Sequence, residues 1–319
     1  MDATIVKLSF QGPVHFGAGR LTDGAYTCDA ATLFSALYIE ALRMGEAEGL
    51  LAAARRGDLA LSDAFPFVGS TFYLPKPMTA PGTFEQKAGA KPGDSRERKA
   101  NKKLGYVPAA KYADYMAGRF DAVAELARFK PGVSSLQAKV NLERLNGPDA
   151  EPYYVGGFSF APNAGLYFLV QGSYDCRPIL EQLSYSGIGG RRSSGYGRFT
   201  YAVAPAKELG CSLSLGAAAG GSAGAAGGSG TSVLLSTAAP TEAELGDGLL
   251  AGARYRLVRK GGFIQSATHS DSPQKKRDLY LFAAGSTFAR RFEGGVFDVN
   301  ATAGAHPVYR YARAFWMGV

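Results

Sequence analysis

Glycine and arginine are concentrated in one short segment, residues 187–198, whose sequence is GIGGRRSSGYGR. Glycine has no side chain, so its backbone N–H groups can approach an anion closely and can line an anion-binding concavity. Arginine adds a planar guanidinium whose donors match phosphate oxygens. The segment is therefore a candidate phosphate-binding loop. Its members are Gly187, Ile188, Gly189, Gly190, Arg191, Arg192, Ser193, Ser194, Gly195, Tyr196, Gly197 and Arg198.

Two common nucleotide-cofactor motifs do not fit this loop. A Walker A loop needs GxxxxGK[ST], and that string does not occur in the chain. A dinucleotide fingerprint, GxGxxG, needs a third glycine at the position of Arg192. That fingerprint also follows a strand and precedes a helix, whereas this loop is expected to follow a helix and precede a strand. A phosphodiester backbone remains as the ligand, with Tyr196 offering a ring on which a base could stack. The alternative is a tight turn with solvated arginines.

The composition is compatible with a polyanionic partner. The chain has 319 residues and a net charge of +8, with 46% hydrophobic residues, enough for two compact domains. Cys28, Cys176 and Cys211 are far apart and form no CxxC pair, so we expect no zinc site and no disulfide framework. We expect no cofactor. No stretch reaches the ~20 apolar residues of a membrane span, and the N-terminus lacks a signal peptide's apolar core, so we expect a cytoplasmic protein.

The elements around the loop predict the order strand, helix, two strands, helix, strand. Residues 3–10 alternate like a strand, and an amphipathic helix follows with Asp29 as its cap. Residues 153–160 and 166–171 are expected to form a β-hairpin. A short helix beginning near Pro178 leads into the loop, and a strand leaves it. This order is typical of a ferredoxin-like, or RRM-like, α+β domain.

A long insertion, at about residues 76–130, follows the first helix. Residues 80–103 are polar and basic, and we expect them to form a mobile segment, with two short helices after it, around 111–117 and 121–129. A solvated loop without a binding role is the alternative for the basic run. Its candidate RNA-contacting residues are Arg96, Arg98, Lys102 and Lys103.

Residues 216–230 contain only glycine, alanine and serine, which is typical of a flexible linker. We therefore predict an N-terminal domain over residues 1–208, a linker over 209–231, and a smaller α+β domain over 232–319. In that second domain, a short helix is expected to begin at Pro240.

The loop resembles the G-h-G-x5-G-h-G-x-h loop of the RAMP superfamily of CRISPR RNA-binding proteins. Residues 187–189, five intervening residues, residues 195–197, Arg198 and Phe199 fill every position. Other segments look like the subunit that caps the guide-RNA 5′ end in type III-A, or Csm, interference complexes. They are LSDAFPFVGSTFYLPKP, KKLGYVP, GLYF, RKGGFIQS, GSTF and VYRYARAFW. The chain departs from that family at Ala30 and Ala31, which stand between Asp29 and the Thr-Leu-Phe of residues 32–34, and at Ala312, where glycine is common.

The resemblance implies a non-catalytic subunit with two ferredoxin-like RAMP domains. It would hold the repeat-derived 5′ handle of the guide RNA and contact the large polymerase-like subunit and the first backbone subunit. The loop becomes the main handle contact, and the basic run at 96–103 resembles the thumb-like element of RAMP subunits. Further candidates for RNA contact are His15, Lys139 and Arg144.

Two enzymatic alternatives stay open at this point. Some RAMP proteins cut RNA without a metal, and His15, just after the first strand, is the best-placed candidate for proton transfer. A small-molecule phosphate-binding enzyme is the second, although neither nucleotide motif is present. No arrangement of carboxylates and histidines indicates a metal centre.

Overall fold

The computed structural model describes residues 3–17, 19–78, 95–140, 152–211, 215–217, 231–246, 248–266, 269, 272–301 and 304–319. Below, residues 3–211 are called the N-terminal half and residues 231–319 the C-terminal half. The candidate Arg144 lies outside the described residues.

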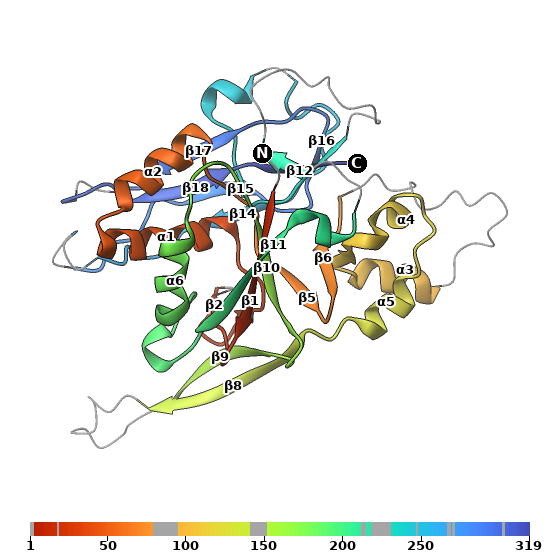
Figure 1. Ribbon diagram of the computed structural model, residues 1–319, viewed down its shortest axis with the longest axis horizontal. Helices are drawn as coiled ribbons and strands as arrows, with labels where there is room; N and C mark the ends of the chain where they lie inside the picture. The colour runs from red at the N-terminus through yellow and green to blue at the C-terminus, as the bar shows by residue number, and fades with distance from the viewer. Residues whose placement is uncertain are drawn as a thin grey trace.

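An antiparallel sheet forms the centre of the N-terminal half (Figure 1). Within the described residues its strand order is β11-β1-β10-β5-β6-β7, with β4 paired beside β10. The strands are β1 (Thr4–Phe10), β4 (Ala60–Leu61), β5 (Phe65–Val68), β6 (Thr71–Pro75), β7 (Tyr106–Pro108), β10 (Ala164–Gln171) and β11 (Phe199–Pro205).

Both faces of this sheet are covered, as the alternation along β1 requires. Val6 and Leu8 face a core made with α1 (Ala30–Met44), α2 (Ala47–Arg56) and α6 (Arg177–Ser186). Ile5 faces the opposite core, which includes residues of α4 (Tyr112–Met116) and of the C-terminal half. The predicted first helix is confirmed, because the Asp29 side chain caps α1 by accepting from the Thr32 N–H at 2.8 Å.

The predicted hairpin of residues 153–160 with 166–171 is wrong. β9 (Pro152–Phe160) pairs along its length with β8 (Gly132–Val140), whereas β10 pairs with β1, β4 and β5. The physical reason is burial: β10 is buried over residues 164–169 and takes a central place in the sheet, while β8 and β9 form a ribbon that projects from the body (Figure 1).

The basic run at 95–103 is a helix, α3 (Ser95–Lys103), and not a mobile segment. Its sequence, SRERKANKK, contains no glycine or proline and consists mainly of good helix formers. Residues 80–94 of the predicted mobile segment lie outside the described residues. The two short helices predicted after it are confirmed as α4 and α5 (Ala122–Arg128).

A second sheet has the order β12-β19-β13-β16, and two separate ribbons accompany it. Its strand β12 (Leu215–Ala217) comes from the segment between the two halves, so residues 216 and 217 of the predicted flexible linker belong to a strand, while residues 218–230 lie outside the described residues. The strands of the C-terminal half are β13 (Ser232–Leu234), β14 (Leu257–Lys260), β15 (Leu279–Phe282), β16 (Thr287–Phe288), β17 (Gly294–Asp298), β18 (Tyr309–Arg313) and β19 (Phe315–Gly318). β14 pairs with β15, and β17 pairs with β18. The helix expected from Pro240 is instead a short 3-10 turn at Glu242–Leu245.

The two halves share buried contacts. The ring of Tyr311 on β18 stacks on Phe34 of α1 at 5.0 Å, and its hydroxyl oxygen accepts from the Leu61 N–H at 2.9 Å. Phe315 and Met317 lie in the core that also contains Ile5. The remaining described strands, β2 (Phe16–Gly17) and β3 (Gly24–Ala25), form a small ribbon after β1.

Candidate nucleic-acid interface

The glycine-rich loop packs against the segment that follows β1. Gly190 donates its N–H to the His15 carbonyl at 2.8 Å, and Gly197 donates to the Pro13 carbonyl at 2.9 Å. The loop also closes on itself, because the Ile188 N–H donates to the Gly197 carbonyl at 3.0 Å. The Ile188 side chain is buried in the core beneath α1 and α6. These contacts hold the loop in one conformation.

Three of the glycines are required by this internal packing. A Cβ at Gly197 would lie 2.0 Å from the Ile188 carbonyl oxygen, and one at Gly187 would lie 2.8 Å from the Tyr196 carbonyl oxygen. At Gly189 a Cβ would lie 2.8 Å from the His15 carbonyl oxygen. All three residues also have positive φ angles, which favour glycine. Close approach of a ligand is therefore not needed to explain them.

The two adjacent arginines of the loop have different surroundings. Arg191 has a φ of 60° and is the non-glycine residue with a positive φ among those described. Its guanidinium lies 5.2 Å above the ring of Tyr153 on β9. Arg192 lies 3.7 Å from the buried carboxylate of Glu40 on α1, which also accepts hydrogen bonds from Arg43 and Ser186. Ser193, Ser194 and Arg198 are exposed.

The prediction that Tyr196 offers a ring for base stacking is wrong in this structure. The side chain is 3% exposed, and its hydroxyl donates to the Gln137 side chain of β8 at 2.7 Å. The ring is therefore enclosed between the loop and the β8–β9 ribbon and has no face open to a base.

The structure brings some of the predicted site residues together. His15 is buried, with its Nδ1 atom 2.6 Å from the Gly156 carbonyl oxygen. Its backbone carbonyl accepts the hydrogen bond from Gly190 of the loop. Lys139 on β8 is in register with Tyr153, the residue that Arg191 covers. The loop and His15 thus contact the ribbon along its length, and Lys139 lies near the end of the ribbon that is far from β10.

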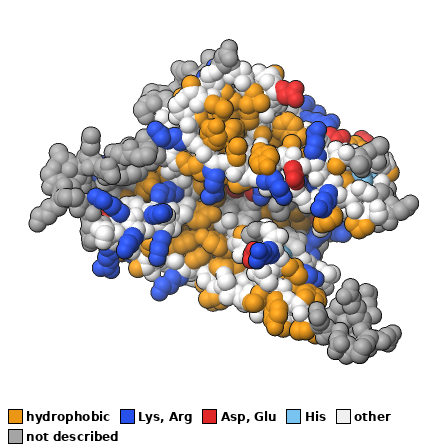
Figure 2. All heavy atoms as spheres, turned by 180° about the vertical axis from the view of Figure 1, so that it is seen from behind, with side chains coloured by type: hydrophobic (Ala, Val, Ile, Leu, Met, Phe, Trp, Pro, Cys, Tyr) orange, Lys and Arg blue, Asp and Glu red, His pale blue; other side chains and the backbone are white. Residues whose placement is uncertain are grey.

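Helix α3 does not belong to this group. Its basic residues Arg96, Arg98, Lys102 and Lys103 are exposed on the opposite side of the molecule from α6 (Figure 1). Lys and Arg side chains gather on the side where α3, α4 and α5 lie, as the view from behind shows (Figure 2). These residues form a separate basic surface.

A cleft of about 1650 Å³ lies between the two halves. We call it the central cleft. Its N-terminal wall contains residues of α1, Lys76 after β6, and the glycine-rich loop through Gly189, Gly190 and Arg192. Its C-terminal wall contains β14 and the segments 261–266 and 306–310. Seven Lys and Arg residues line it, against three Asp and Glu, so the cleft favours an anion. The cations are Arg43, Lys76, Arg192, Arg256, Lys260, Lys276 and Arg310.

Two of the acidic residues in the cleft are already engaged. Asp29 forms an ion pair with Lys260. Burial pushes the pKa of Asp29 upward, but the Lys260 ammonium and the hydrogen bonds from Thr32 outweigh it, so the pKa lies below its usual value. Asp63 accepts from the Ala30 N–H, the Thr237 N–H and the Thr237 hydroxyl. Burial and the charge of Asp29 raise the pKa of Asp63 to about 7.

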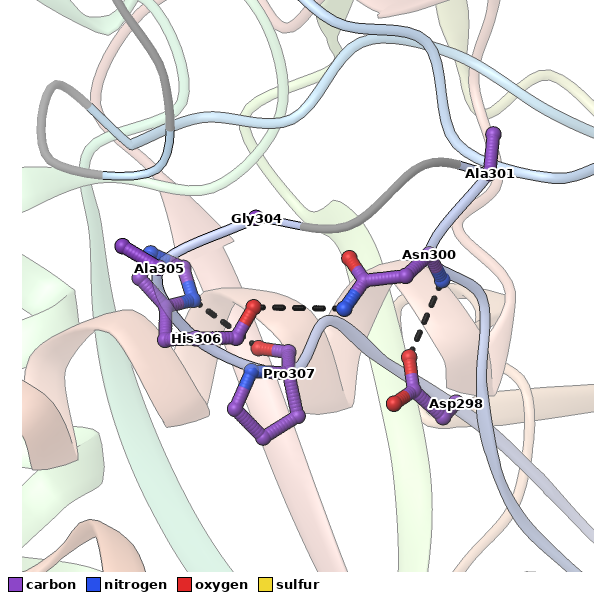
Figure 3. Close-up of a pocket in the computed structure, with 7 residues that line it drawn as sticks. All are labelled: Asp298, Asn300, Ala301, Gly304, Ala305, His306 and Pro307. Carbon is purple, nitrogen blue, oxygen red and sulfur yellow. Dashed lines mark hydrogen bonds between the residues drawn. The ribbon is translucent and has the colours of Figure 1, made fainter.

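A smaller pocket of about 530 Å³ borders the cleft (Figure 3). Its polar groups are largely bonded to one another: Asn300 donates its amide N–H to Asp298 and its side-chain Nδ2 to the His306 carbonyl. His306 and Pro307 also line the central cleft. The pocket is therefore part of one wall of the larger site.

Sequence reasoning missed the C-terminal wall. Arg256, Lys276 and Arg310 come from three separate segments, and only the fold brings them together. A signal was nevertheless present, because RKGGFIQS and VYRYARAFW each combine basic with aromatic or apolar residues. Within the described residues, no cluster of three or more His, Cys, Asp or Glu side chains could hold a metal ion. No helix of the described part is long and apolar enough to cross a membrane.

Solved structures with a similar fold come from CRISPR complexes. The chain matches one in the Csm3-Csm4 subcomplex of the type III-A CRISPR-Cas interference complex with a TM-score of 0.64 and 15% identity, covering 100% of this chain and 99% of that one. It matches a chain of the Csm1-Csm4 cassette in complex with cA4 with a TM-score of 0.61 and 21% identity, covering 100% and 98%. The chain therefore shares its fold, over its full length, with these chains of Csm assemblies.

Comparison of the amino-acid sequence with known proteins identifies the family to which the chain belongs. Residues 228–319 match the family model of the CRISPR Csm4 C-terminal domain. The CRISPR system Cms protein Csm4 of Mycobacterium tuberculosis (strain CDC 1551 / Oshkosh) is 38% identical over 325 residues, which cover 100% of this chain and 98% of that protein. The Streptococcus thermophilus protein of the same name is 32% identical, over 98% and 97%. The chain belongs to the Csm4 family, and the resemblance to a RAMP subunit of the Csm complex is confirmed.

Proposed function

We propose that this chain is a non-catalytic guide-RNA-binding subunit of a type III-A interference complex, and that it holds the repeat-derived 5′ handle of the guide RNA. The observation that carries this proposal is the central cleft, whose walls present an excess of cations beside the glycine-rich loop. A groove with this charge suits the backbone of single-stranded RNA. Arg191, Arg192 and Arg198 would contact handle phosphates at the entrance formed by the loop.

The arrangement of the N-terminal half supports a ferredoxin-like RAMP domain. Four neighbouring strands of the sheet lie in the order β11-β1-β10-β5, with α1 and α6 packed on one face. Following β1, α1, β5, β10, α6 and β11 along the chain gives a βαββαβ order, in which β5 takes the place that the sequence prediction gave to residues 153–160. We propose a second RAMP-like domain over residues 232–319, joined by the segment 209–231.

The same family membership supports the choice of protein partners. The solved structures that share the fold include a Csm1-Csm4 cassette and a Csm3-Csm4 subcomplex. By analogy, this chain would dock to the large polymerase-like subunit and to a backbone RAMP subunit, and so place the handle at one end of the assembly.

The endoribonuclease alternative is not favoured. His15 is 7% exposed, its Nδ1 atom is engaged by the Gly156 carbonyl, and its backbone anchors the glycine-rich loop. These contacts give His15 a structural role without any proton transfer to RNA.

The test is a mobility-shift and cleavage assay with labelled 5′-handle RNA at two salt concentrations, using the chain assembled with its partner subunits. The variants are Arg191→Ala with Arg192→Ala, and His15→Ala. Arg119→Ala with Arg177→Ala is the control, because both arginines are exposed and each pairs with a nearby aspartate. We expect intact RNA, a shift with the wild type, and a salt slope that falls by about 0.7 for each phosphate that the loop variant no longer binds.

Three outcomes would contradict parts of this proposal. RNA cleavage that disappears in His15→Ala would establish the endoribonuclease hypothesis. A salt slope equal to that of the control would remove the loop from the RNA interface. Failure of the wild-type assembly to retain handle RNA would contradict the proposed function as a whole.

A further inference from the structure

The C-terminal wall of the central cleft contains two cationic side chains that lack an anionic partner among the described residues. Among the described residues the Lys276 ammonium group has no hydrogen-bond or ion-pair partner, and the one charged group that acts on it is Arg310. Arg310 donates from one terminal nitrogen to the Gly261 carbonyl at 3.1 Å, while its buried Nε–H has no acceptor there. Buried donors without acceptors are costly, so this pair is well suited to an added anion.

The backbone holds these residues firmly. The Lys276 N–H donates to the Gly262 carbonyl at 2.8 Å, and Lys276 also forms a bridge with Asn300 on its other side. Arg310 lies on β18 and pairs with Phe297 of β17. Gly261, which receives the Arg310 hydrogen bond, directly follows β14. The two cations are therefore carried by separate segments that meet at one wall of the cleft.

The neighbouring charges do not neutralise the pair. The acidic groups whose charge acts on Arg310 are Asp29 and Asp278. Asp29 is paired with Lys260, and Asp278 lies 3.5 Å from Arg259. Burial and the positive charge of Arg310 lower the pKa of Lys276 to about 8. The site thus has an excess of positive charge, and the repulsion between Arg310 and Lys276 disfavours the charged form of Lys276.

We propose that Lys276 and Arg310 form a phosphate subsite that binds one phosphodiester of the RNA in the central cleft, opposite the glycine-rich loop. This rests on the proposed function and adds a second contact, supplied by the C-terminal half. The two walls of the cleft would hold the strand between them. Arg310 offers a forked donor, and Lys276 a compact charge, for the oxygens of the same phosphate.

The chain supplies a matched control one residue away. Lys275 carries the same charge as Lys276 but is paired with Phe263 and lies 5.8 Å above that ring. Phe263 lines the cleft, but Lys275 does not line it, so its ammonium group lies outside the site formed by Lys276 and Arg310. Lys275→Gln therefore changes the net charge as Lys276→Gln does, without altering the proposed subsite.

The experiment measures the affinity of labelled single-stranded handle RNA for the assembled complex by fluorescence anisotropy, at several salt concentrations. The variants are Lys276→Gln, Arg310→Gln, both together, and Lys275→Gln. We expect each subsite variant to weaken binding about 10- to 100-fold, as loss of a charged hydrogen bond predicts. The double variant should lower the salt slope by about 0.7, the value for one phosphate, and should cost less than the two single losses combined because both groups serve one anion.

Arg310→Lys keeps the positive charge but removes the guanidinium that donates to the Gly261 carbonyl. It therefore tests whether a loss of RNA affinity in Arg310→Gln comes from the lost charge or from misfolding. It should bind RNA more tightly than Arg310→Gln, and Lys276→Gln should melt at the wild-type temperature. In a further measurement, excess adenosine monophosphate is added to the complex with bound RNA, and the released RNA is followed by anisotropy. RNA held by several phosphate contacts should resist displacement by it, whereas a small-molecule phosphate site should release the RNA.

The outcomes separate the subsite from the proposed function. If the wild type binds RNA and the Lys276 and Arg310 variants behave like Lys275→Gln, the subsite is wrong and the proposed function stands. Displacement of RNA by the mononucleotide would also overturn the subsite as an RNA contact. If the wild-type complex fails to bind handle RNA, the proposed function itself fails.

Discussion

Replacing Gly197 by alanine should destabilise the chain far more than replacing Gly195, although both lie in the same loop. Both have positive φ angles, 76° and 83°. An alanine in that region costs roughly 1–2 kcal/mol, offset in part by the lower entropy of the unfolded chain, about 0.4–1 kcal/mol. At Gly195 the added Cβ meets no described atom within 4 Å, so the net cost should stay at about 1 kcal/mol.

At Gly197 the same atom would lie 2.0 Å from the Ile188 carbonyl oxygen, which is backbone and cannot rotate away. The strand entering β11 or the turn at Ile188 must shift, and the hydrogen bond between Ile188 and Gly197 is strained. Overpacking of this kind adds about 3 kcal/mol. We therefore expect a total of about 4 kcal/mol for Gly197→Ala, roughly four times the cost at Gly195.

Thermal melting of the two variants beside the wild type provides the assay. With roughly 2–4 °C per kcal/mol for a unit of about 200 residues, such as the N-terminal half that carries the loop, Gly195→Ala should melt a few degrees lower and Gly197→Ala about 10 °C lower. Equal shifts would refute the argument that the loop closes on its own glycines. An unshifted Gly197→Ala that loses RNA binding would show that the glycine serves ligand approach instead.

Two pH dependences follow from the cleft. Burial and Arg310 lower the pKa of Lys276 to about 8, so the cationic form that binds phosphate is lost as the pH rises through that value. RNA affinity should fall between about pH 7 and pH 9, and Lys276→Arg, which stays charged, should remove that part of the decline; an unchanged decline would contradict it. For Asp63, the folded-state pKa of about 7 lies above the ordinary aspartate value, so the folded state holds the proton more tightly. Its stabilising contribution is present at low pH and is lost as the pH rises to about 7. The stability advantage of the wild type over Asp63→Asn should therefore shrink between about pH 4 and pH 7 in urea unfolding, and an advantage that grows over this range would contradict the raised pKa.

Local patterns were sufficient for several elements. Alternation of apolar residues predicted β1, and the i, i+4 repeat with Asp29 at its start predicted α1 together with its cap. Both depend on residues close in sequence, where side-chain spacing directly reflects the backbone period. The glycine-rich loop was also found from sequence, since its unusual composition is local.

Features that depend on distant residues were not predicted. β9 has a strand pattern, but the pattern does not state its partner, and β8 was missed beside it. Tyr196 was assigned to stacking because a loop residue is usually exposed, whereas Gln137 and the ribbon enclose it. The C-terminal wall of the cleft requires β14, β18 and the segment around Lys276 to meet, and no single stretch contains that information.

The most direct test of the account is to map where guide RNA touches the chain, by ultraviolet cross-linking of the assembled complex followed by mass spectrometry of the linked peptides. We expect cross-links to peptides from both walls of the central cleft, one containing the glycine-rich loop and the other containing Lys276 or Arg310. Cross-links confined to α3 and its exposed basic surface, with neither wall labelled, would contradict it.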